Sequence, residues 1–172
     1  MNAVIYHGGR PGDAGVEALH AQLTALLQAR GWAVETLRLA ELSIKPCRGC
    51  FACWLKTPGA CAIADDGRTA ARAFVQHDLV IFLTPVTFGG YASPLKLALD
   101  RIIPAASPFF MRVNGEMHHK RRYPKPPRIC AVGWLPQADE AAAEVFRRLL
   151  ARNAINFHAP VSASLVLHAE QD

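Results

Sequence analysis

The chain alternates between short apolar runs and longer stretches in which apolar residues recur at helical spacing. Five apolar runs predict strands, at residues 3–6, 32–39, 79–83, 128–132 and 161–167. The third run reads Leu-Val-Ile-Phe-Leu. It is apolar on both faces, which is typical of a central parallel strand covered by helices on both sides. The pattern therefore predicts a parallel sheet between two layers of helices.

Helical spacing fills the gaps between these strands. The first helix presents the apolar residues Val16, Leu19, Leu23, Leu26 and Leu27. A second helix starts at Asp65 or Asp66, a third at Ser93-Pro94, and a fourth covers about residues 138–153. Residues 104–127 hold five of the twelve prolines and are predicted to be irregular. This alternation predicts a doubly wound α/β fold, with residues 1–172 forming one domain.

Three loops are predicted to meet at one edge of this sheet. They follow the first, third and fourth strands and cover residues 7–15, 84–93 and 133–137. Doubly wound sheets bind ligands at the carboxyl ends of the strands, where the strand order reverses. Glycines in the first two loops let a main chain approach a ligand closely. We therefore expect a ligand site formed by these loops.

Four of the five cysteines form a second candidate site. Cys47, Cys50, Cys53 and Cys61 have the spacing Cys-x-x-Cys-x-x-Cys-x(7)-Cys. Thiolates suit iron–sulfur clusters and zinc. A Cys₄ zinc site usually pairs two Cys-x-x-Cys knuckles across a longer spacer, which this chain lacks. Three interpretations stay open at this point: a cluster, a zinc ion, or a thiol-rich loop without metal.

The composition narrows the class of protein. The chain has 172 residues, of which 51% are hydrophobic and 19% charged, and this argues against disorder. No apolar run reaches the length of a membrane span, and no signal peptide is recognisable, so a cytoplasmic location is expected. The net charge of +5 suits a polyanionic cofactor and does not by itself indicate nucleic acid.

The residues of the second loop and the cysteine segment carry a family resemblance. Residues 84–96, Thr-Pro-Val-Thr-Phe-Gly-Gly-Tyr-Ala-Ser-Pro-Leu-Lys, are followed by Asp100-Arg101. This block resembles the flavin loop of flavodoxin-like NAD(P)H-dependent FMN reductases. The cysteine segment with Asp65-Asp66 is similar to that of their iron–sulfur flavoprotein branch. The resemblance implies a three-layer α/β/α sandwich with a five-stranded parallel sheet.

The same resemblance implies the cofactors and the residues that bind them. FMN would contact Gly8, Gly9, Arg10, Pro85, Val86, Thr87, Phe88, Gly89, Gly90 and Trp134. The first loop lacks the hydroxyl residues of the family pattern, so we expect Arg10 and main-chain amides to hold the phosphate. A 4Fe–4S cluster, if present, would use Cys47, Cys50, Cys53 and Cys61. NAD(P)H would be the co-substrate.

The implied activity is an oxidoreductase that passes hydride or electrons through FMN to a quinone, a free flavin or another small acceptor. An electron carrier without its own substrate turnover is the alternative, and a non-redox zinc- or ligand-binding module is a third. We also expect a homodimer or a higher homo-oligomer. Residues 168–172 are too short and polar to form the helix that usually follows the fifth strand, which would leave apolar sheet surface open.

Overall fold

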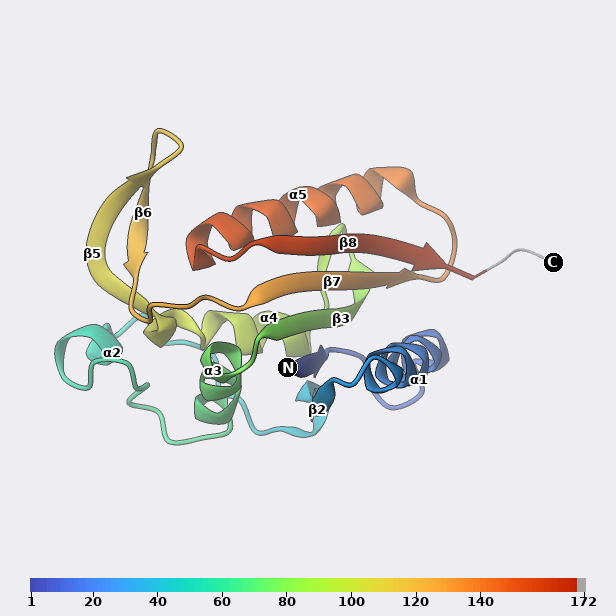
Figure 1. Ribbon diagram of the computed structural model, residues 1–172, viewed down its shortest axis with the longest axis horizontal. Helices are drawn as coiled ribbons and strands as arrows, with labels where there is room; N and C mark the ends of the chain where they lie inside the picture. Colours follow the sequence, from blue (N-terminus) through green and yellow to red (C-terminus); the bar gives the residue numbers. More distant parts are fainter. Residues whose placement is uncertain (170–172) are drawn as a thin grey trace.

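A sheet of five parallel strands in the order β2-β1-β3-β7-β8 forms the centre of the computed structural model (Figure 1), which describes residues 1–169. The strands are β1 (Asn2–His7), β2 (Ala33–Arg38), β3 (Leu79–Thr87), β7 (Arg128–Leu135) and β8 (Val161–His168). This is the flavodoxin-like strand order. The predicted five-stranded parallel sheet is therefore confirmed.

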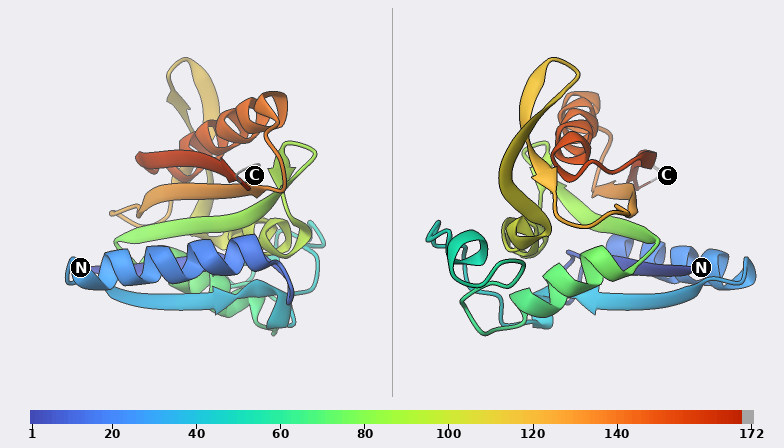
Figure 2. Two further views of the ribbon diagram at one scale, coloured as in Figure 1. Left: turned by 90° about the vertical axis from the view of Figure 1, so that its right-hand side faces the viewer. Right: turned by 60° about the vertical axis from the view of Figure 1, so that its left-hand side comes forward.

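Helices cover both faces of the sheet, as expected for three layers (Figure 2). They are α1 (Ala14–Ala29), α3 (Gly67–Gln76), α4 (Ser93–Asp100) and α5 (Glu140–Phe157). The short helix α2 (Ala52–Leu55) lies away from the sheet (Figure 1), and η1 (Leu39–Glu41) and η2 (Ile103–Ala105) are short 3₁₀ turns. Side chains alternate along β1: Ala3 and Ile5 belong to the core under α1, whereas Val4 and Tyr6 belong to the core shared with α3, α4 and α5.

The strand order reverses between β1 and β3, which are direct neighbours. The first loop leaves β1 at this point, and the Gly8 amide donates a 2.7 Å hydrogen bond to the carbonyl of Leu83 on β3. The three predicted loops therefore emerge at the carboxyl ends of β1, β3 and β7, where a doubly wound sheet binds its ligand.

The prediction of an irregular segment at residues 104–127 is wrong. Strands β5 (Ala106–Val113) and β6 (Glu116–Arg121) pair antiparallel and stand away from the main sheet (Figure 1). Asn114 and Gly115 join them with φ angles of 49° and 84°. An Asn-Gly pair favours this two-residue turn because both positions need a left-handed backbone. Pro108 coincides with a shift in register between Ala106 and Phe110, where a strand tolerates proline.

The second loop is also more regular than predicted. Strand β3 continues to Thr87, and β4 (Gly90–Tyr91) pairs back against it. Phe88 and Gly89 form the turn with φ angles of 50° and 74°. The loop is therefore a tight hairpin with a fixed main-chain path.

Two predicted helix caps differ from the structure. Ala92 holds the N-cap position of α4, with Ser93 as the first helical residue. Asp66 precedes α3 without capping it, because its carboxylate accepts instead from the amide of Ser43 at 2.8 Å. Asp65, the other predicted cap, does accept from the amide of Gly67 at the start of α3, at 3.0 Å. The Ser93 hydroxyl accepts from Arg10 instead of capping α4.

The far edge of the sheet presents apolar side chains to solvent. Val161, Leu165 and Leu167 of β8 are each at least 40% exposed. The expectation that no helix follows β8 concerns residues beyond Ala169, which lie outside the described residues. Within residues 1–169, no helix is both long and apolar enough to cross a membrane.

Candidate functional site

The first loop lies so close to its neighbours that two of its positions require glycine. A Cβ at Gly8 would approach the Leu95 Cβ to 2.9 Å and the Thr84 hydroxyl to 3.1 Å. A Cβ at Gly9 would lie 3.0 Å from side-chain atoms of His7 and Val16. These glycines let the main chain pass between β3, α4 and α1. The loop can therefore present amide groups to a ligand at short range.

Arg10 reaches from this loop to the start of α4. Its Nη2 donates to the Ser93 hydroxyl at 3.2 Å. A pocket of about 300 Å³ opens beside Arg10 and Ser93, with walls from Pro11, Leu39, Ala40, Leu42, Pro94 and Leu97. An arginine, a hydroxyl and a helix N-terminus together suit a phosphate group. Ser93 adds a hydroxyl beside Arg10, and the first loop has none. The sequence placed Ser93 at the end of the predicted ligand loop, residues 84–93, and also as a helix cap.

Asp13 has a structural role in the same loop. Its carboxylate accepts a 2.7 Å hydrogen bond from the Arg10 amide and so closes the turn before α1. The contact satisfies a main-chain donor that would otherwise need water. The carboxylate of Asp13 therefore stabilises the loop through this hydrogen bond.

The hairpin between β3 and α4 carries most of the residues predicted to bind FMN. The buried hydroxyl of Thr84 accepts from the Ala92 amide at 3.1 Å and donates to the Pro85 carbonyl at 3.0 Å, which fixes both ends of the hairpin. Val86 is buried and Pro85 is half-buried. The hairpin is therefore held from behind while its turn reaches into solvent.

The turn of this hairpin rests on α5. A Cβ at Gly89 would lie 2.7 Å from Val145, so the turn contacts that helix directly. Thr87 and Phe88 are exposed, and Phe88 is exposed completely. A fully exposed phenylalanine in a left-handed turn gains no packing energy within this chain. Its ring is available to a flat ligand.

Trp134 joins the third loop to the first. A Cβ at Gly15 would lie only 2.1 Å from the indole, so the ring of Trp134 covers the first turn of α1. A Cβ at Gly133 would lie 2.6 Å from Val86, which brings the end of β7 against β3. The predicted flavin residues therefore share one edge of the sheet. This edge combines a main chain made accessible by glycines, the polar groups of Arg10 and Ser93, and the rings of Phe88 and Trp134. Together these features fit FMN.

A buried histidine lies beneath the first loop, and the sequence pattern gave no signal for its partners. The His7 ring is 1% exposed, and its Nε2 lies 3.3 Å from the carboxylate of Glu17. Glu17 is also bound by Arg38 at 2.7 Å and 3.1 Å. Burial lowers the pKa of His7, partly offset by Glu17. This group links β1, α1 and β2 directly behind Gly8.

The four clustered cysteines line a single pocket. Cys47 and Cys50 are exposed, Cys61 is partly exposed and Cys53 is buried. The pocket holds about 50 Å³ and also includes Arg101. Burial, together with the neighbouring thiols of Cys61, Cys47 and Cys50, raises the pKa of Cys53. The sequence prediction that these four residues come together is consistent with this arrangement.

The arrangement differs from that of a mononuclear metal site. Among residues 1–169, no three side chains of His, Cys, Asp or Glu are assembled as the ligands of one ion would be. A 4Fe–4S cluster distributes its four thiolates over four iron atoms, so its ligands surround a wider space. The four thiols are the donor set that such a cluster uses, although the cavity of about 50 Å³ would have to widen to hold one. A bound cluster stays a prediction.

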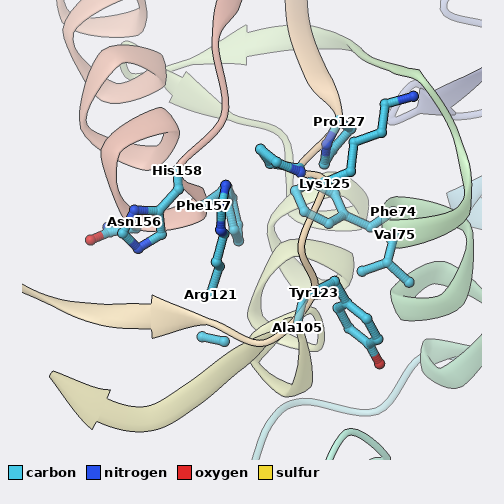
Figure 3. Close-up of a pocket in the computed structure, with 12 residues that line it drawn as sticks. Phe74, Val75, Ala105, Arg121, Tyr123, Lys125, Pro127, Asn156, Phe157 and His158 are labelled. Atoms are coloured by element: carbon cyan, nitrogen blue, oxygen red, sulfur yellow. The ribbon is translucent and has the colours of Figure 1, made fainter. Parts of the chain in front are cut away.

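Three further pockets differ in size and position. The largest, about 400 Å³, lies between α4, α5 and the β5–β6 hairpin and includes Cys47 and His119. A pocket of about 270 Å³ adjoins it and extends to Gly90 and Tyr91. The pocket in Figure 3, between Phe74, Tyr123 and Phe157, holds about 30 Å³. That is room for about one water molecule and not for a cofactor.

Comparisons with known proteins agree with this geometry. The family described as NADPH-dependent FMN reductase matches residues 7–155. An iron–sulfur flavoprotein of Methanocaldococcus jannaschii is 34% identical over 96 residues, which cover 56% of this chain and 46% of that protein. The chain thus matches about half the length of this relative.

Solved structures share the fold at low sequence identity. An azoreductase, AzrA, superposes with a TM-score of 0.68 at 16% identity, covering 98% of this chain and 86% of the other. An NAD(P)H:quinone oxidoreductase from Methanothermobacter marburgensis gives 0.66 at 12% identity, with coverages of 98% and 85%. An FMN-dependent NADH-azoreductase from Bacillus anthracis, solved with FMN, gives 0.61 at 11% identity, with coverages of 97% and 85%. These likenesses concern the fold.

Proposed function

Because the chain belongs to the NADPH-dependent FMN reductase family, we propose that it binds FMN at the carboxyl ends of β1, β3 and β7 and passes electrons from NAD(P)H to a small acceptor. The observation that carries this proposal is the contact between Arg10 and Ser93. It joins the two glycine-containing loops at the point where the strand order reverses, with a pocket beside them.

The residues at this edge divide the work of binding. Arg10, the Ser93 hydroxyl and the N-terminus of α4 hold the phosphate, since a cation, a hydroxyl donor and a helix dipole favour an anion. Main-chain groups of residues 87–90 hold the pyrimidine edge of the flavin, and the tight hairpin keeps them in place. FMN, when bound, supplies hydride chemistry between NAD(P)H and the acceptor. The chain itself positions the reactants and excludes water.

The acceptor class is part of this proposal. Solved structures with the same fold are named azoreductases and a quinone oxidoreductase. We infer that flat aromatic acceptors such as quinones, azo compounds or free flavin accept electrons here. The exposed Phe88 ring beside the hairpin turn supports a flat acceptor, because aromatic faces stack on one another.

The test is a titration of the purified protein with FMN, followed by NADH or NADPH without oxygen. We expect saturable binding of about one FMN per chain and then loss of the visible absorbance of the oxidised flavin. An electron carrier would bind FMN but would keep it oxidised until a separate reductase is added. Absence of FMN binding would overturn the proposal.

We further propose that the cysteine pocket holds a 4Fe–4S cluster. Four thiols around one cavity and the partial match to an iron–sulfur flavoprotein support it. Cys47, Cys50, Cys53 and Cys61 would hold the cluster, which would supply one-electron chemistry. Iron, acid-labile sulfide and zinc, measured in protein purified without oxygen, test it. Zinc without sulfide, or no metal at all, would contradict the cluster.

A homodimer is the third part of the proposal. The open apolar face of β8 and the exposed Phe109 and Phe110 of the β5–β6 hairpin support it. Exposed apolar side chains of this kind are typical of contacts between protein chains. A cytoplasmic location stays a prediction from the sequence.

A further inference from the structure

Arg101, which follows α4, is a fully buried cation with an unusual set of contacts. Its Nη1 donates to the carbonyl of Lys45 at 2.7 Å and to Asp65 at 2.9 Å. Its Nη2 donates to Asp65 at 2.7 Å and to the carbonyl of Ile63 at 3.3 Å. These four bonds account for the four Nη hydrogens of the guanidinium. They tie α4 to the chain on both sides of the cysteine segment.

The fifth donor of Arg101 is left over. Its Nε is buried and has no hydrogen-bond partner among residues 1–169. Buried donors are almost always paired, so each exception needs an explanation. Arg101 and Cys61 line the same cysteine pocket. The hydrogen bond with Asp65, followed by the influence of Cys61, raises the pKa of the Arg101 guanidinium. The hydrogen bonds that tie α4 to the cysteine segment use the Nη groups and leave Nε without a function.

The chain also keeps space for this side chain. A Cβ at Gly67, the first residue of α3, would lie 2.8 Å from Cζ and 3.0 Å from both Nη atoms of Arg101. Asp65 is fixed in turn by the amides of Lys45 and Gly67 at 2.9 Å and 3.0 Å. The guanidinium is therefore held in one orientation, with few alternative positions for Nε.

We propose that Arg101 donates its Nε–H to the ligand sulfur of Cys61 in the loaded pocket and thereby raises the reduction potential of the cluster, an inference that rests on the cluster proposed above. Reduction adds one electron to the cluster and its thiolates. A hydrogen bond to sulfur and a nearby buried positive charge stabilise that added negative charge. Arg101 is thus a positioning and tuning residue that contacts the cluster through its ligand.

The test compares three variants with the wild-type protein, all purified without oxygen. Arg101→Lys keeps the positive charge and removes the planar donor fork. Gly67→Ala keeps Arg101 but forces its guanidinium to move. Arg68→Lys is the matched control. Arg68 lies on α3 next to Gly67, and its Nε donates to the main-chain carbonyl of Cys61 at 2.8 Å rather than to its sulfur. Iron content, thermal unfolding and the midpoint potential are measured for each.

We expect a lower midpoint potential in Arg101→Lys and in Gly67→Ala, with Arg68→Lys close to the wild type. If Arg101→Lys does not fold, Gly67→Ala decides the question alone. Wild-type iron content together with an unchanged potential in Gly67→Ala overturns the inference and leaves the cluster proposal standing. A wild-type protein without iron and sulfide overturns both.

Discussion

The Nη2 atom of Arg10 lies 3.2 Å from the Ser93 hydroxyl, although 83 positions separate the two residues in the sequence. This contact joins the first loop to the start of α4, the helix that follows the β3–β4 hairpin. A single anion placed there can bind both side chains at once.

Replacing Arg10 by Ala should weaken FMN binding about tenfold to a hundredfold, since a hydrogen bond to a charged group contributes about 1.5–3 kcal/mol. Riboflavin, which lacks the phosphate, should bind nearly as well to the variant as to the wild type. Fluorescence titrations with both ligands check this. Ser93→Ala should show the same selectivity with a smaller effect. An equal loss for the two ligands would assign Arg10 a role away from the phosphate.

The two glycines of the hairpin should respond differently to substitution. Gly89→Ala forces a left-handed backbone on alanine and brings its Cβ to 2.7 Å from Val145, so we expect a loss of stability of about 1–2 kcal/mol. Gly90→Ala meets only the carbonyl of Thr87 at 3.4 Å and should fold normally. Urea unfolding curves distinguish the two.

Gly90 also allows a test of the flavin contact itself. Gly90→Val should leave the fold intact but obstruct the approach of a flat ring to the main chain, and so weaken FMN and riboflavin alike. Unchanged flavin affinity in a folded Gly90→Val protein would exclude this hairpin as the flavin site.

Cys61→Ser should lower the iron content of protein purified without oxygen, whereas Cys130→Ser should not. Cys130 lies on β7, outside the cysteine pocket, where burial raises the pKa of its thiol to about 11. Its position outside that pocket separates Cys130 from the four proposed ligands. Equal iron loss in both variants would indicate a general folding defect rather than a lost ligand.

The ion pair of Asp65 with Arg101 should make the free energy of unfolding depend on pH. The hydrogen bond between Asp65 and Arg101 lowers the pKa of the carboxyl from 3.8 to about 2. A depressed pKa in the folded state contributes stability above the unfolded value near 3.8, and that contribution is lost as the pH falls toward about 2. The loss should be about 2 kcal/mol. Asp65→Asn should be less stable at neutral pH and should lack this decline, as urea unfolding at several pH values would reveal.

Light scattering tests the proposed dimer. We expect a mass near twice the 18.7 kDa of one chain at micromolar concentration. Leu165→Glu places a charge on the open face of β8 and should shift the protein toward the single-chain mass. Leu55→Glu is the control, because Leu55 is 76% exposed on α2. A single-chain mass for the wild type would exclude the dimer.

The sequence predicted the sheet, its helices and the edge that carries the candidate flavin site. Apolar runs such as residues 79–83 indicate buried strands without any knowledge of tertiary contacts. The sequence pattern missed the β5–β6 hairpin, since prolines at both ends outweighed the Asn114-Gly115 turn signal. It also missed the roles of Ser93 and Arg101. Their contacts with Arg10 and Asp65 join segments 83 and 36 positions apart, and no local pattern encodes such pairs.

Helix α4 has only eight residues, a length of about 12 Å. Ser93 at its first turn belongs to the flavin edge, and Arg101 just beyond its last turn belongs to the cysteine pocket. Inserting or deleting one residue in α4 would rotate these two ends by about 100° relative to one another. The length of this helix therefore sets the spacing between the proposed flavin edge and the cysteine pocket, and changing one of them without the other requires that α4 keep its register.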